Sequence, residues 1–193
     1  MFQVYTIIYL DFDYTLTKQV NPNIDKRFFT SYCILEHSGF VSQKFIEQNR
    51  QLYKKYSIYE QDNSINFETR DFYTKKWFKE NLEIFKQEKQ LKKNIYDQLM
   101  VKSQNQFFFR NGIKELFELI EKYEIPLYII SGGIKEVIQS TLKYVITNFN
   151  QLVQKGLIHI VSNEFIYNNE THEIETYKEP MIYTFNKSIV IHN

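Results

Sequence analysis

Residues 4–17, which read VYTIIYLDFDYTLT, decide the fold of this chain. β-Branched and aromatic residues predict a buried strand over residues 4–10, and Asp11 and Asp13 follow directly. Because alternate side chains of a strand face the same side, both carboxylates emerge together where the strand meets solvent. Two carboxylates held so close repel each other unless a cation or a proton relieves them. The pair therefore predicts Mg²⁺ binding and nucleophilic chemistry on phosphate, with a plain polar turn as the alternative.

Composition narrows the class of protein. The chain has 193 residues, enough for one domain or for a core with a small insert. Lys and Arg (24) nearly balance Asp and Glu (23), which gives no basis for a nucleic-acid or anionic-membrane partner. Cys33 is the only cysteine, so an intramolecular disulfide and a cysteine-based zinc site are excluded. No signal-peptide pattern and no run of ~18 apolar residues occurs, so we expect a cytoplasmic, soluble protein.

The hydrophobic pattern divides the chain into a helical part and a part in which strands and helices alternate. Residues 21–106 have a helical pattern with a break at 62–64. Further along we expect helices over 113–123 and 135–145, strands over 127–130, 157–161 and 181–185, and a tight turn at 131–133. Alternating strands and helices predict a parallel sheet, whose ligands bind beyond the carboxyl ends of its strands. Asp11, Asp13 and Ser131 all fall at those ends.

These residue types fit the hydrolysis of a phosphate ester. Asp11 suits a nucleophile that attacks phosphorus, and Asp13 can protonate the leaving oxygen and then activate water. Ser131 precedes Gly132 and a predicted helix, so its hydroxyl and the neighbouring backbone N–H groups can bind an anion. A plain turn is the alternative interpretation of residues 131–133. The four histidines show no metal-ligand spacing.

Two motifs resemble those of the haloacid dehalogenase-like phosphatases. Residues 11–17 (DFDYTLT) resemble the first motif of that superfamily, and residues 129–133 (IISGG) resemble the second. The likeness to one of its families, the cytosolic pyrimidine 5′-nucleotidases of type III, is closer and extends over residues 109–117, 125–138, 161–163 (VSN) and 182–187 (IYTFNK). That family reads Ile-His-Thr-(Phe/Tyr)-Asn-Lys at the last of these sites.

The resemblance implies a fold and a set of site residues. We expect an α/β protein with a Rossmann-like parallel sheet, its core formed by residues 1–20 and 105–193, and an inserted helical cap over residues 21–104. In the core, Asp11 and Asp13 are the implied catalytic residues and Mg²⁺ ligands. The implied phosphate- or substrate-binding residues of the core are Thr15, Ser131, Gly132 and Lys187. A solvated surface lysine is the alternative interpretation of Lys187.

The cap of that family recognises the nucleobase, and residues 71–75 (DFYTK) resemble its Glu-Trp-(Trp/Tyr)-Thr-Lys stretch. Asp71 would accept hydrogen bonds from the base, and Phe72 or Tyr73 would pack against it. The alternative is an ordinary exposed aspartate on an amphipathic helix.

The resemblance also implies a fourth motif beyond the lysine, whose first aspartate completes the Mg²⁺ site. Residues 188–193 (SIVIHN) contain no carboxylate side chain. We therefore expect either an incomplete version of a longer protein, with a C-terminally incomplete core, or a diverged homologue. In both cases Mg²⁺ would be held weakly by Asp11 and the backbone carbonyl of Asp13.

Two hypotheses of function remain. The first is a monomeric, Mg²⁺-dependent 5′-nucleotidase that hydrolyses pyrimidine nucleoside 5′-monophosphates through an aspartyl-phosphate. The second is an inactive remnant that binds a nucleotide or a protein. A phosphatase of the same superfamily acting on phosphoserine or a sugar phosphate is a nearer alternative to the first.

Overall fold

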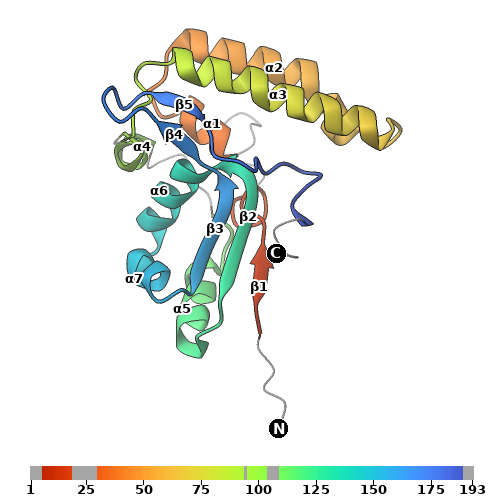
Figure 1. Cartoon of the computed structure of the whole chain (residues 1–193). Coiled ribbons are helices and arrows are strands. Elements are labelled where there is room, and N and C mark those ends of the chain that lie inside the picture. The colour runs from red at the N-terminus through yellow and green to blue at the C-terminus, as the bar shows by residue number, and fades with distance from the viewer. Residues whose placement is uncertain (1–5, 19–29, 94, 104–108, 189–193) are drawn as a thin grey trace.

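The computed structural model describes residues 6–18, 30–93, 95–103 and 109–188 (Figure 1). Within these ranges the elements in chain order are β1 (Ile8–Leu10), α1 (Ser31–Glu36), α2 (Gln43–Gln61), α3 (Phe67–Gln87), α4 (Tyr96–Ser103), α5 (Ile113–Tyr123), β2 (Leu127–Ile134), α6 (Lys135–Val145), α7 (Phe149–Gln154), β3 (Ile158–Asn163), β4 (Phe165–Tyr167) and β5 (Ile174–Tyr177). None of the described helices is both long and apolar enough to span a membrane.

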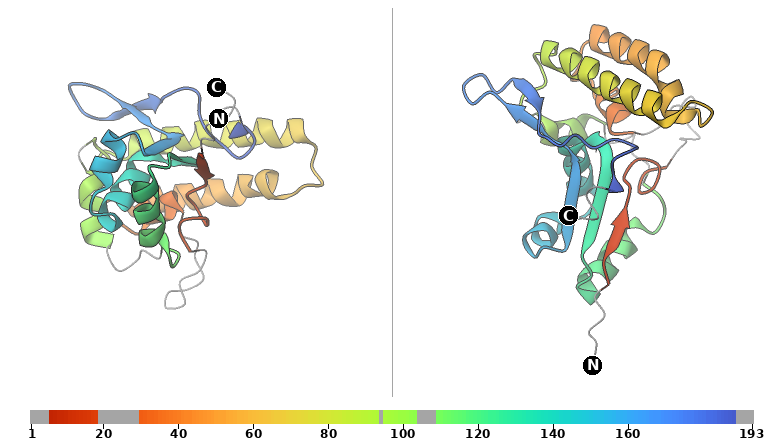
Figure 2. Two further views of the ribbon diagram at one scale, coloured as in Figure 1. Left: turned by 90° about the horizontal axis from the view of Figure 1, so that it is seen from below. Right: turned by 45° about the vertical axis from the view of Figure 1, so that its right-hand side comes forward.

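A parallel sheet with the order β1-β2-β3 forms the centre of the molecule. Leu127 of β2 pairs with Ile8 of β1 and with Ile158 of β3, so the three strands start level and their carboxyl ends meet at one edge. β4 and β5 form a separate antiparallel hairpin. The helical hairpin of α2 and α3 lies beyond the carboxyl ends of the sheet in both Figure 1 and Figure 2. Any ligand at that edge therefore lies between the sheet and this helical hairpin.

Local sequence explains the helices that support the sheet. Helix α5 buries Ile113, Phe117 and Ile120, which recur at the helical period, and exposes the charged residues between them. Ser42 and Asn66 are the N-cap residues of the long helices α2 and α3, and their side chains accept hydrogen bonds from the first turn. Such caps satisfy N–H groups that have no partner within the helix.

The core joins the sheet to these helices. One face of strand β2 is fully buried, since Leu127 and Ile129 are inaccessible to solvent, whereas Tyr128 on the other face is half-buried. Val137 and Ile138 of α6 are equally buried and belong to the same cluster. This packing fixes the strand end at which Ser131 lies.

Several predictions from the sequence are confirmed. The parallel sheet is present, and the helices over 113–123 and 135–145 have the predicted bounds. The predicted break between two helices at 62–64 lies between α2 and α3. Strand β1 is shorter than the predicted 4–10, and residues 4 and 5 lie outside the described part of the chain. The short helix α7 was not predicted. The division into a core and a cap at 21–104 stays a prediction.

Two predictions were wrong. Residues 131–133 do not form a tight turn, because β2 runs on to Ile134, which pairs with Asn163 of β3. Residues 181–185 do not form a strand. The side chain of Asn163 instead bonds both the N–H and the C=O of Ile182, at 2.8 Å each, and so takes the place of a neighbouring strand.

Candidate active site

A tight turn after β1 carries the two aspartates. The carbonyl of Phe12 accepts the N–H groups of Leu16 (3.0 Å) and Thr17 (3.2 Å), which closes the turn. Tyr14 has a φ of 63°, a left-handed conformation that is rare for a bulky residue. Its carbonyl accepts two hydrogen bonds from the Arg110 guanidinium, at 2.6 and 3.1 Å, which hold the turn in this conformation.

The two carboxylates have different surroundings. Asp11 Oδ1 accepts the Phe12 N–H at 2.8 Å, and Asp13 Oδ1 accepts the Ser31 N–H at 2.9 Å. Desolvation raises the pKa of Asp13 to about 7; the Ser31 N–H opposes this shift and the charge of Asp11 adds to it. Asp13 is thus a carboxyl group that can exchange a proton near neutral pH.

Ser131 and its two glycines lie at the carboxyl end of β2. Ser131 is 1% exposed, and its Oγ accepts the Gly133 N–H at 3.1 Å. A Cβ on Gly133 would lie 2.4 Å from Ser31 Oγ and 3.1 Å from Ser131 Oγ, so any other residue there would force the Ser31 hydroxyl to shift. Ser31 Oγ in turn accepts the Ile134 N–H at 3.1 Å. The hydroxyl of Ser131 is therefore fixed beside the aspartate turn.

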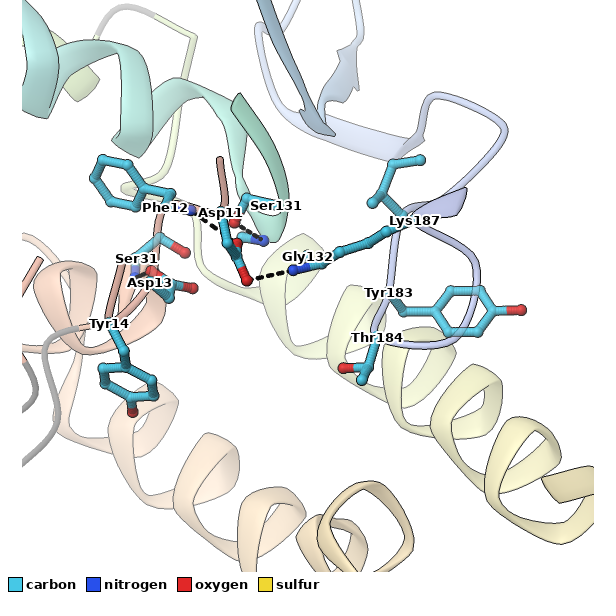
Figure 3. Close-up of polar contacts among 12 residues, drawn as sticks. Asp11, Phe12, Asp13, Tyr14, Ser31, Ser131, Gly132, Tyr183, Thr184 and Lys187 are labelled. Atoms are coloured by element: carbon cyan, nitrogen blue, oxygen red, sulfur yellow. Dashed lines mark hydrogen bonds and ion pairs between the residues drawn. The ribbon is translucent and has the colours of Figure 1, made fainter. Parts of the chain in front are cut away.

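Lys187 reaches the same place from the other end of the described chain. Its Nζ forms an ion pair with Asp11 Oδ2 across 176 positions of sequence. Figure 3 shows Lys187 reaching Asp11 from one side, whereas Asp13 and Ser31 lie on the other. The structure therefore brings together four of the predicted site residues: Asp11, Asp13, Ser131 and Lys187.

Of the remaining predicted site residues, Thr15 and Gly132 adjoin these four residues, whereas Asp71 lies on the helical hairpin. Thr15 is exposed in the aspartate turn, and Gly132 adjoins Ser131 in β2. Asp71 lies on α3, where its carboxylate accepts the Lys75 Nζ at 2.6 Å and the Tyr183 hydroxyl at 2.9 Å. Partial desolvation opposes these two bonds, which nevertheless hold the pKa of Asp71 below its ordinary value.

The two aromatic residues that follow Asp71 differ in their packing. The ring of Tyr73 stacks on that of Tyr59 with a centroid distance of 4.0 Å, whereas Phe72 is 61% exposed. Base recognition by residues 71–73 stays a prediction.

Three residues that shape the site were not singled out from the sequence. Ser31 holds Asp13 through its N–H and β2 through its hydroxyl, and Arg110 holds the aspartate turn. Asn163 donates to the Gly132 carbonyl at 2.9 Å besides bonding Ile182. In the sequence, Arg110 and Asn163 stood out only as members of segments 109–117 and 161–163, which resemble the family. No sequence feature pointed to Ser31.

The aspartate pair fits a magnesium ion. Mg²⁺ takes oxygen ligands and is commonly held by one or two carboxylates together with waters and substrate phosphates. Asp11 and Asp13 supply such oxygens, and the raised pKa of Asp13 reflects a desolvated charge that a cation would stabilise. Within the described ranges, no group of three or more His, Cys, Asp or Glu side chains is arranged to hold a metal.

This fold and this arrangement of residues define a haloacid dehalogenase-like protein. A family model described as "Pyrimidine 5'-nucleotidase (UMPH-1)" matches residues 14–193. The chain therefore belongs to the pyrimidine 5′-nucleotidase (UMPH-1) family.

Comparison with solved structures agrees on the fold. Cytosolic 5′-nucleotidase IIIB, solved with bound cytidine, superimposes with a TM-score of 0.72 at 24% identity over 94% of this chain and 57% of that one. A phosphoserine phosphohydrolase-like protein from Francisella tularensis has a TM-score of 0.51 at 20% identity over 91% of this chain and 65% of that one.

Curated relatives are 5′-nucleotidases by name. A "7-methylguanosine phosphate-specific 5'-nucleotidase" of Gallus gallus is 25% identical over 92% of this chain and 57% of its own length. A "Putative cytosolic 5'-nucleotidase 3" of Caenorhabditis elegans is 25% identical over 95% of this chain and 46% of its own length. The chain thus spans about half of the length of the curated relatives it matches.

Proposed function

We propose that this protein is a cytosolic, Mg²⁺-dependent 5′-nucleotidase that hydrolyses nucleoside 5′-monophosphates through an aspartyl-phosphate on Asp11. The observation that carries the proposal is the ion pair between Asp11 and Lys187 at the carboxyl-end edge of a parallel sheet, where ligands bind. It supports a nucleophilic role for Asp11 and phosphate binding by Lys187. Membership of a 5′-nucleotidase family supports the same activity.

The chemistry follows from the positions of the side chains. Asp11 Oδ attacks phosphorus and forms the acyl-phosphate bond, while the bond between phosphorus and the nucleoside 5′ oxygen breaks. Asp13 donates its proton to that leaving oxygen and then takes a proton from the water that attacks the acyl-phosphate. Water releases inorganic phosphate and restores the Asp11 carboxylate.

The remaining groups bind the phosphoryl oxygens. Lys187 would neutralise their charge, and the Ser131 hydroxyl and the Gly132 N–H would donate hydrogen bonds to them. A magnesium ion held by Asp11 and Asp13 would reduce the repulsion between carboxylate and phosphate. Lys187 also leaves the Asp11 charge balanced when no substrate is bound.

The base of the substrate would lie against the hairpin of α2 and α3, which is the part of the molecule beyond the carboxyl ends of the strands (Figure 1). The relatives' names point to two kinds of base, pyrimidines and 7-methylguanine. We propose that the substrate is one of these nucleoside 5′-monophosphates.

Phosphate release from a panel of monophosphates tests the proposal. CMP, UMP, 7-methylguanosine monophosphate, phosphoserine and a sugar phosphate would be compared with Mg²⁺ and with a chelator. We expect at least one nucleotide to release phosphate faster than phosphoserine and the sugar phosphate do. The release should depend on Mg²⁺, and Asp11→Asn should release none.

Two results would contradict the proposal. Faster release from phosphoserine or the sugar phosphate would show a different phosphatase of the superfamily. No turnover at high Mg²⁺, together with nucleotide binding that Asp11→Asn does not change, would show a binding protein without catalysis.

A further inference from the structure

The segment that carries Lys187 has no helix or strand of its own before residue 188. We call residues 181–187 the lysine loop; residues 184–187 form a turn. Asn186 closes this turn, because its Oδ1 accepts the Tyr183 N–H at 2.8 Å and its backbone N–H donates to the Tyr183 carbonyl at 3.1 Å. A shift of the Tyr183 backbone would therefore move Lys187, four residues further on.

The lysine loop is attached to the sheet on one side. Asn163 of β3 bonds the backbone of Ile182 twice, and the loop backbone passes close to β2, since a Cβ on Gly132 would lie 3.6 Å from Tyr183 Cα. These contacts fix where the loop begins. They do not hold the side chains of residues 183–185, which face the helical hairpin.

The helical hairpin holds the loop on its other side. The hydroxyl of Tyr183 donates to Asp71 of α3 at 2.9 Å, and the hydroxyl of Thr184 donates to Glu60 of α2. The Arg70 guanidinium lies 4.7 Å from the ring centre of Phe185. Three consecutive residues of the loop thus contact α2 or α3.

We propose that Tyr183, through its hydrogen bond to Asp71, is a positioning residue that keeps Lys187 on Asp11 and links the lysine loop to the helical hairpin. Tyr183 is only 6% exposed and its side chain points away from Asp11 (Figure 3), so it acts through the loop and does not touch the reacting atoms. Its hydroxyl bonds a carboxylate, and such charge-assisted bonds are stronger than neutral ones.

One consequence is that the hairpin and the catalytic lysine move together. A ligand that shifts α3 would shift Asp71, Tyr183 and then Lys187. This inference rests on the proposed function for its meaning in catalysis, but the position of Lys187 can be measured without turnover.

Competitive acetylation of lysines, quantified by mass spectrometry on the whole chain, measures that position directly. In the wild type the ion pair with Asp11 protects Lys187. Tyr183→Phe removes only the hydroxyl, and Asp71→Ala removes its acceptor; we expect each to raise the labelling rate of Lys187 about fivefold, the factor typical of one lost hydrogen bond. The double variant should label no faster than either single variant, because both remove the same bond.

Two variants serve as controls. Asp71→Asn keeps an oxygen that accepts the Tyr183 hydroxyl but removes its charge, so the labelling rate of Lys187 should rise less than in Asp71→Ala. Tyr144→Phe removes a hydroxyl from a tyrosine of α6 that is 50% exposed, and should leave Lys187 at the wild-type rate. Lys75 is expected to change as well, because its Nζ pairs with Asp71. Unchanged labelling of the lysines other than Lys75 and Lys187 shows that each variant is folded.

Kinetics provide the second readout. If the chain turns over a nucleotide, Tyr183→Phe and Asp71→Ala should lower kcat by a similar factor on every nucleotide tested. Wild-type protection of Lys187 in both variants would overturn the inference, whether or not the protein is active. Absence of turnover with the expected labelling pattern would contradict the proposed function alone.

Discussion

Gly133 shows how closely the site is packed at the level of single residues. A methyl group at this position would overlap Ser31 Oγ, which is itself engaged with the Ile134 N–H. At Gly132 the same addition would meet backbone atoms at 3.5 and 3.6 Å, an ordinary contact distance. The two adjacent glycines therefore differ in how much space surrounds them.

We predict that Gly133→Ala lowers the free energy of unfolding by about 1–3 kcal/mol, the usual cost of overpacking a core. Gly132→Ala is the matched control and should cost less. Urea unfolding of both variants measures the difference. Equal losses, or a smaller loss at Gly133, would show that the Ser31 hydroxyl moves aside at little cost.

Asn163 is a second residue on which the site depends. It is 1% exposed, and its amide donates to two carbonyls, those of Gly132 and Ile182. Asn163→Asp would place a carboxylate oxygen against both carbonyls. We expect it to lower the free energy of unfolding at neutral pH by about 1–3 kcal/mol, the cost of a buried group without its partner.

The same exchange at Asn150, an exposed residue of α7, is the control and should change stability little. Chemical denaturation at pH 7 and at pH 4 compares the two. The Asn163→Asp loss should shrink at the lower pH, because a protonated carboxyl can again donate. A loss of equal size at both pH values would contradict this explanation.

At the level of elements, a buried carboxyl joins α6 to the hairpin of β4 and β5. Glu136 Oε1 accepts the Phe165 N–H at 3.0 Å and the Tyr167 hydroxyl at 3.1 Å. Its other oxygen, Oε2, is buried and has no hydrogen-bond partner among the described residues. Desolvation raises the pKa of Glu136 to about 7, against the backbone N–H groups that lower it.

A folded-state pKa above the unfolded one makes stability depend on pH. The native state keeps its proton between the unfolded pKa, ordinarily 4.5, and about 7, so the contribution of Glu136 to stability falls as pH rises through this range. Glu136→Gln keeps an accepting oxygen and removes the charge. We expect the variant to gain roughly 1–3 kcal/mol over the wild type at pH 8 and little or nothing at pH 4.

Denaturant unfolding at several pH values measures this gain. Glu118→Gln, at an exposed position of α5, is the control for the loss of a charge. A gain that is the same at pH 4 and pH 8 would contradict the assignment to Glu136 titration.

The sequence predicted the elements whose pattern is local. The helices over 113–123 and 135–145 carry their own hydrophobic periodicity, and their bounds were correct. Residues 181–185 look like a strand, but a strand needs a neighbouring backbone, and here the Asn163 side chain provides the hydrogen bonds. No local pattern reveals such a substitution.

The same distinction applies to the site. Asp11, Asp13, Ser131 and Lys187, which lie together in the structure, were singled out from the sequence because they belong to recurrent motifs. The bond between Asp71 and Tyr183 was not predicted, because Tyr183 lies 112 positions away in sequence and meets Asp71 only in the folded chain.

At the level of the whole molecule, the site forms where three parts of the chain meet: the end of the sheet, the helical hairpin and the lysine loop. Asp11 and Asp13 concentrate negative charge there, and Lys187 offsets part of it. A ligand that completes this charge balance binds the native state only, and so stabilises the entire fold.

We predict that Mg²⁺ and inorganic phosphate together raise the melting temperature by a few degrees, and that a chelator reverses the shift. Asp11→Asn removes a proposed metal ligand and the partner of Lys187, so its own melting temperature should respond less to the same additions. Thermal unfolding of both proteins with and without the additions checks this. An equal shift in the two would place the binding site elsewhere.

The proposed reaction requires that Asp11 becomes phosphorylated during turnover. Rapid quenching of the protein with a nucleoside monophosphate and Mg²⁺, followed by borohydride, converts an aspartyl-phosphate into homoserine, which peptide mass spectrometry locates. We predict homoserine at position 11, dependent on the nucleotide and absent from Asp11→Asn. Phosphate release without modification of position 11, or homoserine at another aspartate, would contradict the account.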